Sequence, residues 1–281
     1  MRAGIFTNLY KDTDLSVTRL LVETLDKNGV DWLIHRDVGG VFAGNAVFDE
    51  TTAADIDVLI TLGGDGTILR IAEYAARTKT PILGINLGFT GFLTECEPEQ
   101  IGAVIRELGE RSFHTEDRTL LRADFGEGAF HALNDVVVLR DGQSRMPELE
   151  VEIGGELVDR YHCDGFIVST PTGSTAYSLS AGGPIISPHA RALALTPITP
   201  HSLHSRPLVV SEDEQILVRI GGQSVATVIS ADGAIKGTLP AGGVLRVEKS
   251  AYTVSFVRLG TGRGFYSKLL SKLNKWGMTE R

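Results

Sequence analysis

Short apolar runs alternate with helical patterns over the first hundred residues of the chain. Four runs have the length and the polar or glycine boundaries of buried strands: residues 3–7, 32–35, 58–62 and 81–85. Residues 15–27 carry apolar side chains at helical spacing, and a second helical pattern follows Thr67, its predicted N-cap. Pro98 lies at the start of a third helix. This alternation predicts βαβ units and a parallel, Rossmann-like sheet that binds ligands at the carboxyl ends of its strands.

The pattern changes after about residue 115, where short strand-like runs follow one another without long helices between them. These runs are residues 120–125, 129–139, 149–153, 157–161, 166–169, 216–220, 225–230, 244–247 and 254–259. Gly154-Gly155 and Asp232-Gly233 have the chemistry of two-residue hairpin turns. Strands at this spacing predict a β-rich, sandwich-like domain.

The last apolar positions return to helical spacing, from Phe265 to Trp276. We expect a C-terminal helix that packs back on the first domain, with Lys268, Lys272 and Lys275 on its solvated face. The predicted organisation is an α/β nucleotide-binding domain over residues 1–114, an all-β domain over 115–262 and the helix over 263–281.

Composition narrows the class of protein. The formal net charge of −8 over 281 residues weighs against a general nucleic-acid or anionic-membrane surface. No apolar run approaches the roughly 20 residues that a spanning helix needs, and the first residues do not resemble a signal peptide. Cys96 and Cys163 are too far apart for a metal knuckle, and we expect them reduced, with a disulfide between them left open. A cytoplasmic location is the resulting expectation.

The loop at residues 63–67, Gly-Gly-Asp-Gly-Thr, directly follows a predicted buried strand. Glycine lets the backbone approach a ligand closely, and the start of the next helix favours phosphate. The carboxylate of Asp65 repels phosphate unless a cation or a hydroxyl donor intervenes, which points to phosphoryl transfer. The alternative is an ordinary glycine-rich turn with a solvated acid. The chain has no Gly-Lys dipeptide, so a P-loop of the usual form is excluded.

Three further segments are candidates for ligand binding. Residues 86–93 hold Phe89 and Phe92 among glycines and follow a strand, so they form either an apolar shelf for a base or a turn with core aromatics. Residues 169–180 carry eight hydroxyl side chains in twelve positions, which suit a ribose or a phosphate unless they form a mere polar loop. Asn134-Asp135 interrupts an apolar run; a bulge would aim both at one ligand, and an edge strand is the alternative.

Together these segments resemble the NAD kinase family, in motif order and spacing, from the first strand to the closing helix. The loop at 63–67 is shared with a wider superfamily of lipid and phosphofructo-type kinases, whereas residues 169–177 are far more specific to NAD kinases. The resemblance implies transfer of the γ-phosphate of ATP to the 2′-hydroxyl of the adenosine ribose of NAD, giving NADP and ADP. It also implies Mg²⁺ carried on the ATP phosphates without a direct protein ligand, and a homodimer or homotetramer.

The resemblance assigns roles residue by residue. Asp65 is the implied catalytic acid, and Gly63, Gly64 and Thr67 form the phosphate loop. The implied NAD contacts are Gly66, Phe89, Asn134, Asp135, Arg145, His162, Asp164, Thr175, Ala176, Tyr177, Ser178, Leu179 and Ser180.

Three positions depart from the family pattern. Asp135 stands where Glu is more frequent, His162 where some members carry Arg, and Ala234 where Gln or Arg is expected. A lipid kinase of the same superfamily and a catalytically silent NAD-binding sensor are the competing interpretations. The hydroxyl-rich segment weighs against the first, and the presence of Asp65 and Asn134 weighs against the second.

Overall fold

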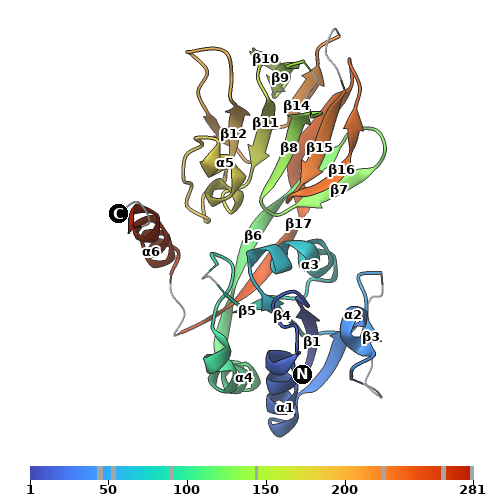
Figure 1. Cartoon of the computed structure of the whole chain (residues 1–281), viewed down its shortest axis with the longest axis vertical. Helices are drawn as coiled ribbons and strands as arrows, with labels where there is room; N and C mark the ends of the chain where they lie inside the picture. The colour runs from blue at the N-terminus through green and yellow to red at the C-terminus, as the bar shows by residue number, and fades with distance from the viewer. Residues whose placement is uncertain are drawn as a thin grey trace. The chain divides into compact units, whose positions relative to one another are not determined.

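The chain divides into two compact units in the computed structural model (Figure 1). The first comprises residues 1–117 and 254–281, and the second comprises residues 118–253. The structure describes residues 1–42, 47–51, 55–88, 91–142, 145–222, 226–260 and 264–278, without the side chains beyond Lys272. Phe89, a predicted NAD contact, lies outside the described residues. None of the described helices is both long enough and apolar enough to cross a membrane.

The first unit follows the predicted alternation of strands and helices. Its elements are β1 (Arg2–Thr7), α1 (Ser16–Lys27), β2 (Asp31–His35), α2 (Arg36–Gly39), β3 (Val47–Phe48), β4 (Val58–Gly63), α3 (Asp65–Thr78), β5 (Ile82–Asn86), the 3₁₀ turn η1 (Pro98–Gln100), α4 (Ile101–Gly109) and α6 (Phe265–Met278). β6 (Phe113–Asp124) and β17 (Val244–Leu259) run across the boundary between the units.

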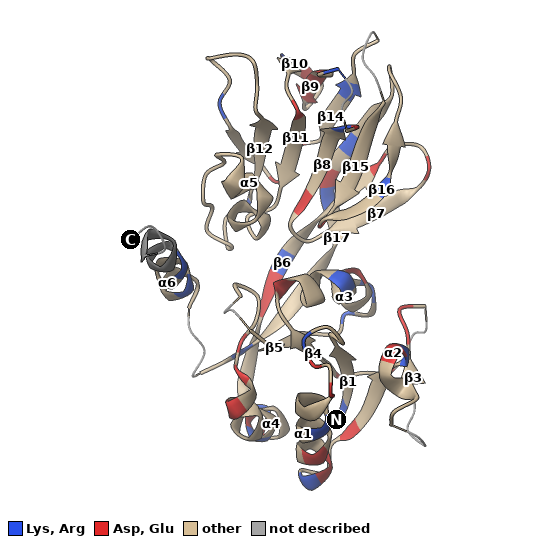
Figure 2. Cartoon of the chain, viewed as in Figure 1, with Lys and Arg blue, Asp and Glu red and all other residues tan. Residues whose placement is uncertain are grey.

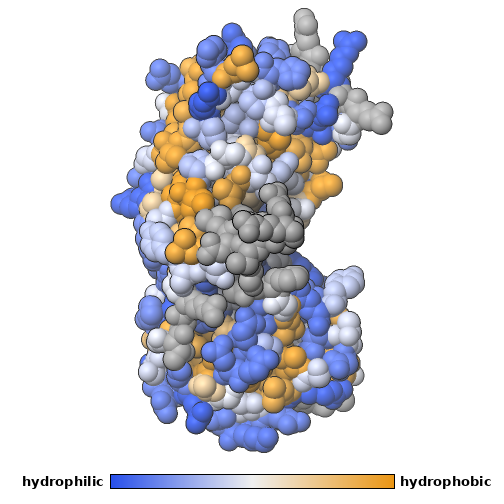
Figure 3. Space-filling model, turned by 60° about the vertical axis from the view of Figure 1, so that its left-hand side comes forward, coloured by the Kyte–Doolittle hydropathy of each residue, from blue (hydrophilic) through white to orange (hydrophobic). Residues whose placement is uncertain are grey.

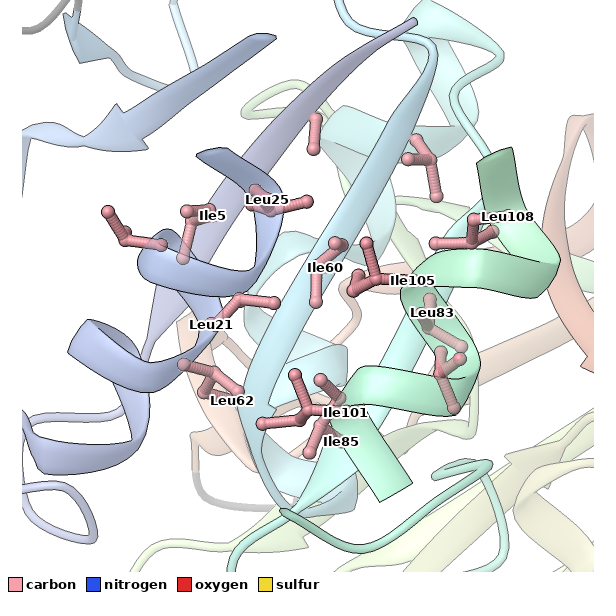
Figure 4. Packing of buried hydrophobic residues seen from close by; sticks show 14 of the residues in the cluster. Ile5, Leu21, Leu25, Ile60, Leu62, Leu83, Ile85, Ile101, Ile105 and Leu108 are labelled. Carbon is pink, nitrogen blue, oxygen red and sulfur yellow. The ribbon is translucent and has the colours of Figure 1, made fainter. Parts of the chain in front are cut away.

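The sheet of the first unit is parallel in the order β3-β2-β1-β4-β5-β17. Its core lies between the sheet and the helices α1 and α4, where Leu21 packs with Ile60 and Ile105 (Figure 4). α3 covers the opposite face: a Cβ on Gly84 would stand 2.8 Å from Ile68 Cδ1. Helices on both faces leave the carboxyl ends of β1, β4 and β5 at one edge, where a ligand can approach.

The second unit is built almost entirely from antiparallel strands. Beyond the shared β6 and β17 its elements are β7 (Ala129–Ala132), β8 (Asp135–Arg140), β9 (Glu148–Ile153), β10 (Glu156–His162), β11 (Gly165–Ser169), η2 (Gly173–Thr175), α5 (Tyr177–Ser180), β12 (Ala192–Ile198), β13 (Leu208–Ser211), β14 (Ile216–Ile220), β15 (Thr227–Ala231) and β16 (Ala234–Leu239). Both predicted hairpin turns are confirmed, at positive φ: Gly154-Gly155 between β9 and β10, and Asp232-Gly233 between β15 and β16.

Two sheets of this unit pack face to face. One holds β10-β9-β14-β17 and the other β13-β12-β11-β8-β15-β16. A single buried cluster joins side chains from both, with Val151 and Val218 on one side and Val138 and Phe166 on the other. The α/β fold with a β-sandwich and a C-terminal helix on the first unit is therefore confirmed. Apolar side chains that remain exposed are interspersed with polar ones on the face that Figure 3 shows.

Several strand assignments from the sequence were wrong in detail. The run 129–139 forms two strands in different sheets, β7 beside β6 and β8 beside β11, because the backbone between them bonds to Asp232 instead of to a strand. The two runs at 244–247 and 254–259 are one strand, β17. β12 was not predicted because Pro197 interrupts its pattern; the proline is tolerated because pairing with β13 ends at Leu195.

Two neighbouring leucines of α1 provide a test of this core. Leu21 is fully buried, whereas Leu20 is 46% exposed on the same helix. We expect Leu21→Ala to lower the free energy of unfolding by about 2–5 kcal/mol, because a cavity remains, and Leu20→Ala to lower it by less than about 1 kcal/mol. Urea denaturation followed by circular dichroism measures both. Equal losses in the two variants would contradict this packing.

Candidate active site

The glycine-rich loop joins the end of β4 to the start of α3. The helix begins at Asp65 with Gly64 as its N-cap, so the prediction that Thr67 is the N-cap was wrong. Thr67 lies one turn inside, where its buried Oγ1 accepts hydrogen bonds from Gly64 N at 3.3 Å and Asn8 Nδ2 at 3.0 Å. This side chain reaches back to the N–H of the cap residue, and the helix begins three residues earlier than the predicted cap implied. Thr67 therefore shapes the loop from inside.

Asp65 joins this loop to the next one along the sheet edge. Its carboxylate accepts hydrogen bonds from Phe92 N at 2.8 Å and Leu93 N at 3.0 Å. A Cβ on Gly91 would overlap the same carboxylate, so only glycine fits at that position. Hydrogen bonds from N–H groups to a carboxylate are stronger than neutral ones and fix its orientation. Each carboxylate oxygen has a further lone pair, which a ligand hydroxyl can use.

The glycines of the first loop have different surroundings. The space beside Gly63 is filled by the side chain of Thr67. The carbonyl of Gly63 accepts a hydrogen bond from Leu87 N at 2.6 Å. Gly66 is exposed, and no atom lies within 4 Å of where its Cβ would stand. Gly66 is thus the position of this loop where a ligand can come closest to the backbone of the helix start.

Lys11 is a residue of this site that the sequence did not reveal. Its Nζ stands 2.8 Å from the place where a Cβ of Gly64 would lie and 3.6 Å from the corresponding place at Gly88. The exposed ammonium group therefore lies over both glycine loops, beside the first turn of α3. The signal was its position just beyond β1, which ends at the same edge of the sheet as β4.

The C-terminal helix contributes buried charge to this region. Lys268 is only 5% exposed and donates to Thr94 O at 2.6 Å, so the prediction of a fully solvated lysine face was wrong. Lys268 is buried because backbone carbonyl groups in residues 92–95 need hydrogen-bond donors. Arg258 is a second such donor and bonds to Leu93 O at 3.3 Å. Figure 2 shows the basic residues of α6. Lys275 lies among the residues whose side chains are not described.

A second carboxylate organises the Asn-Asp pair of the second unit. Asp232 accepts hydrogen bonds from the backbone N–H groups of Leu133 at 2.7 Å, Asn134 at 2.7 Å and Asp135 at 3.1 Å. The chain therefore breaks between β7 and β8 instead of forming the predicted bulge or edge feature. Sequence reasoning identified Asp232 only as a turn residue, because the turn chemistry of Asp-Gly hides its second role.

A pocket of about 500 Å³ opens beside this break on the outer face of the second sheet. It brings together four of the predicted NAD contacts and adds Arg140 and Asp232, which the prediction lacked. Its lining consists of Asn134, Asp135, Val137, Leu139, Arg140, Ala176, Tyr177, Val228, Ser230, Asp232, Gly233 and Ile235. Apolar side chains with a few polar groups are typical of a small-molecule site.

Most hydroxyl groups of the segment 169–180 bind to the protein itself. Ser169, Thr170, Ser174 and Ser178 are fully buried. Thr170 Oγ1 donates to Leu133 O at 2.6 Å, Ser174 Oγ to Pro171 O at 2.6 Å, and Ser178 pairs with Thr196 at 2.9 Å. A Cβ at Gly173 would overlap the carbonyl of Asn134. These groups fix the segment against the Asn-Asp pair.

The other predicted contacts lie apart from the pocket lining. Asp164 forms an ion pair with Arg140 Nε at 3.0 Å, and the Thr199 hydroxyl donates to it. His162 is exposed, 3.2 Å from the carboxylate of Glu148, and Arg145 is also exposed. Thr175 and Leu179 are half-buried, and Ser180 is exposed.

Burial changes the acid–base chemistry of several groups in the chain, among them two carboxyl groups and two thiols. Burial, followed by the charge of Asp232, raises the pKa of Asp135 to about 7. Burial also raises the pKa of Asp232, although its three N–H donors oppose this. The thiols of Cys96 and Cys163 are buried and free, and burial raises the pKa of each to about 12. Asp135 is therefore the acid of the pocket that titrates near neutral pH.

The raised pKa of Asp135 gives a testable dependence of stability on pH. Between about pH 4 and 7 the native state holds a proton that the unfolded chain releases, so the free energy of unfolding falls by up to about 1.4 kcal/mol per pH unit. Asp135→Asn removes this pH-dependent contribution to the free energy of unfolding. We expect the melting temperature of the variant, relative to the wild type, to rise from pH 5 to pH 8.

The control is Asp141→Asn, which changes an exposed carboxylate near the end of β8. Its melting temperature is expected to follow the wild type at every pH. Parallel curves for Asp135→Asn and the wild type would show that Asp135 does not titrate in this range.

Comparisons with known proteins cover nearly the whole chain. Residues 3–113 match the family described as ATP-NAD kinase N-terminal domain, and residues 133–259 match ATP-NAD kinase C-terminal domain. The chain is 36% identical over 277 residues to an NAD kinase of Natranaerobius thermophilus, with 96% of each chain covered.

Two solved structures share the fold. One is the yeast NADH kinase complexed with NADH, with a TM-score of 0.87 and 26% identity over 100% of this chain and 89% of that one. The other is an NAD kinase from Archaeoglobus fulgidus in complex with ATP, with a TM-score of 0.78 and 30% identity over 96% of this chain and 99% of that one.

Proposed function

The chain belongs to the NAD kinase family, and we propose that it transfers the γ-phosphoryl group of ATP to the 2′-hydroxyl of the adenosine ribose of NAD. The products are NADP and ADP. One observation supports this most: half-buried Asp65 stands at the carboxyl end of β4, next to the exposed Gly66, with its carboxylate fixed by two N–H groups. A carboxylate held in this way suits a hydroxyl donor, which explains an acid within a phosphate loop.

In this proposal Asp65 accepts the hydrogen bond of the ribose 2′-hydroxyl and takes its proton. The freed oxygen forms a bond to the γ-phosphorus while the bond to the bridging oxygen of ADP breaks. Phosphoryl transfer depends on positioning and on neutralising charge more than on covalent help. The fixed orientation of Asp65 provides the positioning.

The first unit is suited to binding the phosphate groups of the donor, ATP. The exposed backbone at Gly66, the start of the fourteen-residue α3 and the ammonium group of Lys11 all favour an anion. Among the described residues, no three His, Cys, Asp or Glu side chains gather around a metal position. We propose that Mg²⁺ enters with ATP, bound to its phosphates, as part of the substrate.

The second unit supplies the proposed NAD pocket. Asn134 and Asp135 offer polar groups at its edge, while Ala176 and Tyr177 give it an apolar wall. The raised pKa of Asp135 lets it donate a hydrogen bond as an acid near neutral pH. Asp164, His162, Arg145, Thr175, Leu179 and Ser180 stay proposed contacts, and Ser178 supports the segment through Thr196.

We also propose a cytoplasmic location and a homodimer or homotetramer. The two buried, unpaired thiols suit a reducing compartment. The edge strand β10 exposes Leu157 and Val158, at 46% and 41%, which suits contact with another copy of the chain.

The test of function is formation of NADP from NAD and ATP in the presence of Mg²⁺. Purified protein is coupled to an NADP-specific dehydrogenase, and Asp65→Asn is assayed beside it. We expect the variant to lose at least about 100-fold in turnover, while NAD binding measured by calorimetry persists. A folded wild-type protein that forms no NADP would overturn the proposal. Loss of NAD binding in Asp65→Asn with turnover per bound complex unchanged would make Asp65 a binding residue.

Lys11 gives an independent prediction about the donor. We expect Lys11→Met to raise the KM for ATP roughly tenfold, which corresponds to about 1.4 kcal/mol of lost phosphate binding, with the KM for NAD changed less than twofold. Steady-state kinetics at varied ATP and varied NAD measure both constants. Lys27→Met, which changes an exposed lysine at the end of α1, is the control and is expected to behave as wild type. An equal rise of both KM values in Lys11→Met would contradict a role at the donor phosphates.

A further inference from the structure

The turn that carries Lys11 follows β1 and is fixed at both of its ends. Lys11 N and Asp12 N each donate a hydrogen bond to Asn8 O at 3.0 Å, which closes the turn over residues 8–12. At the far end the buried carboxylate of Asp12 accepts hydrogen bonds from Thr18 N at 2.8 Å and Thr18 Oγ1 at 2.6 Å, so the turn is tied to the first residues of α1. The exposed side chain of Lys11 therefore extends from a backbone whose course is set by its neighbours.

Asn8 uses all of its polar groups to hold this turn in place. Its backbone N–H donates to Leu62 O at 2.9 Å, and its carbonyl closes the turn. Its side-chain Oδ1 accepts a hydrogen bond from Tyr10 N at 3.0 Å, and its Nδ2 donates to Thr67 Oγ1 at 3.0 Å. An amide can donate and accept at the same time, which neither a carboxylate nor an apolar side chain can do. The residue type at this position therefore matches both of its side-chain contacts.

The hydrogen bond from Asn8 to Thr67 joins residues 59 positions apart in the sequence. Thr67 Oγ1 also accepts from the N–H of Gly64, the N-cap residue of α3, so this hydroxyl contacts the start of the helix directly. Between residues 8–12 and residues 63–67, all of which the structure describes, no second side-chain hydrogen bond is present. One amide thus connects the turn of Lys11 with the glycine-rich loop.

The two segments that this amide connects are the parts of the site that favour an anion. Lys11 Nζ stands close to Gly64 and Gly88, and the start of α3 presents exposed backbone at Gly66. A cation and a helix N-terminus can bind the same phosphate group only if the distance between them is kept. A side chain that is already held in place also loses less conformational freedom on binding than a free one.

We propose that Asn8 is a positioning residue for the donor phosphates: its amide holds the turn against Thr67, so that the Lys11 ammonium group and the start of α3 face one anion. The inference rests on the proposed function and deepens it. Lys11 supplies the charge, and Asn8 fixes where that charge lies. Loss of the uncharged side chain of Asn8 is then expected to weaken the binding of a charged ligand, and to do so only while Lys11 is present.

The experiment measures the binding of Mg²⁺-ATP and, separately, of NAD to Asn8→Ser by calorimetry. Serine keeps an oxygen that can accept from Tyr10 N in a turn of this kind, but it is too short to reach Thr67. We expect the Kd for Mg²⁺-ATP to rise roughly threefold or more, as for the loss of one hydrogen bond, with the Kd for NAD changed less than about 1.5-fold. Asn28→Ser is the matched control, because the amide of Asn28 donates to Thr24 O at 2.7 Å in the same unit.

A double-variant cycle separates positioning from a general weakening of the fold. In the Lys11→Met background, Asn8→Ser is expected to raise the Kd for Mg²⁺-ATP by less than about 1.5-fold further, because the cation that Asn8 positions is gone. Thr67→Val removes the same hydrogen bond from its other end and is expected to raise the Kd for Mg²⁺-ATP and not that for NAD. Circular dichroism melts establish which variants are folded at the titration temperature, and Thr67→Val decides if Asn8→Ser is not.

Three results would overturn the inference: an unchanged Kd for Mg²⁺-ATP, an equal rise in the Kd for NAD, or the same rise with and without Lys11. Because both dissociation constants are measured without turnover, they do not depend on formation of NADP. A folded wild-type protein that binds Mg²⁺-ATP and NAD but forms no NADP would instead overturn the proposed function.

Discussion

The hydrogen bonds from Phe92 N and Leu93 N to the Asp65 carboxylate are the constraint on which the first unit's site depends. They tie two loops that end neighbouring parallel strands, β4 and β5, into one rigid edge. Gly91 is required because the carboxylate fills the space that a side chain would need. The same contacts that hold the loops also aim the acid, so its geometry is set before any substrate arrives.

The second unit uses the same physical device for a different purpose. Asp232 accepts three backbone N–H groups and replaces the strand that would otherwise pair with residues 133–135. This break turns Asn134 and Asp135 toward the pocket that Tyr177 lines. Burying two carboxylates near each other is costly. Three N–H donors offset part of this cost at Asp232, whereas burial and the charge of Asp232 raise the pKa of Asp135 to about 7. The burial of this carboxylate pair thus produces a titratable group within the pocket.

Periodicity and spacing in the sequence were enough for the fold class and for the motifs that carry the site. The alternation before residue 115 and the short strands after it correspond to the two observed units because burial pattern and turn chemistry are local properties. The same local properties misled at Thr67, which has the chemistry of an N-cap but lies inside the helix. They misled again at the hydroxyl-rich segment, where Thr170 and Ser178 look like ligand groups but bond to Leu133 and Thr196, residues distant in the chain. A side chain's partner is a tertiary fact that its own segment does not contain.

Three lysines show that the role of a side chain depends on its tertiary contacts. The same residue type takes a different role at each position because it packs against different groups. Lys268 meets the Thr94 carbonyl and the Glu95 carboxylate and becomes a buried structural donor. Lys272, one helical turn later, meets an aromatic face and retains an uncommitted charge. Lys11 extends from a different strand end and lies over two glycine loops, where no carboxylate of the described residues pairs with it. Electrostatic roles of this kind follow from the spacing between elements, and only the packed structure brings a cation at either end of the chain to the loop that carries Asp65.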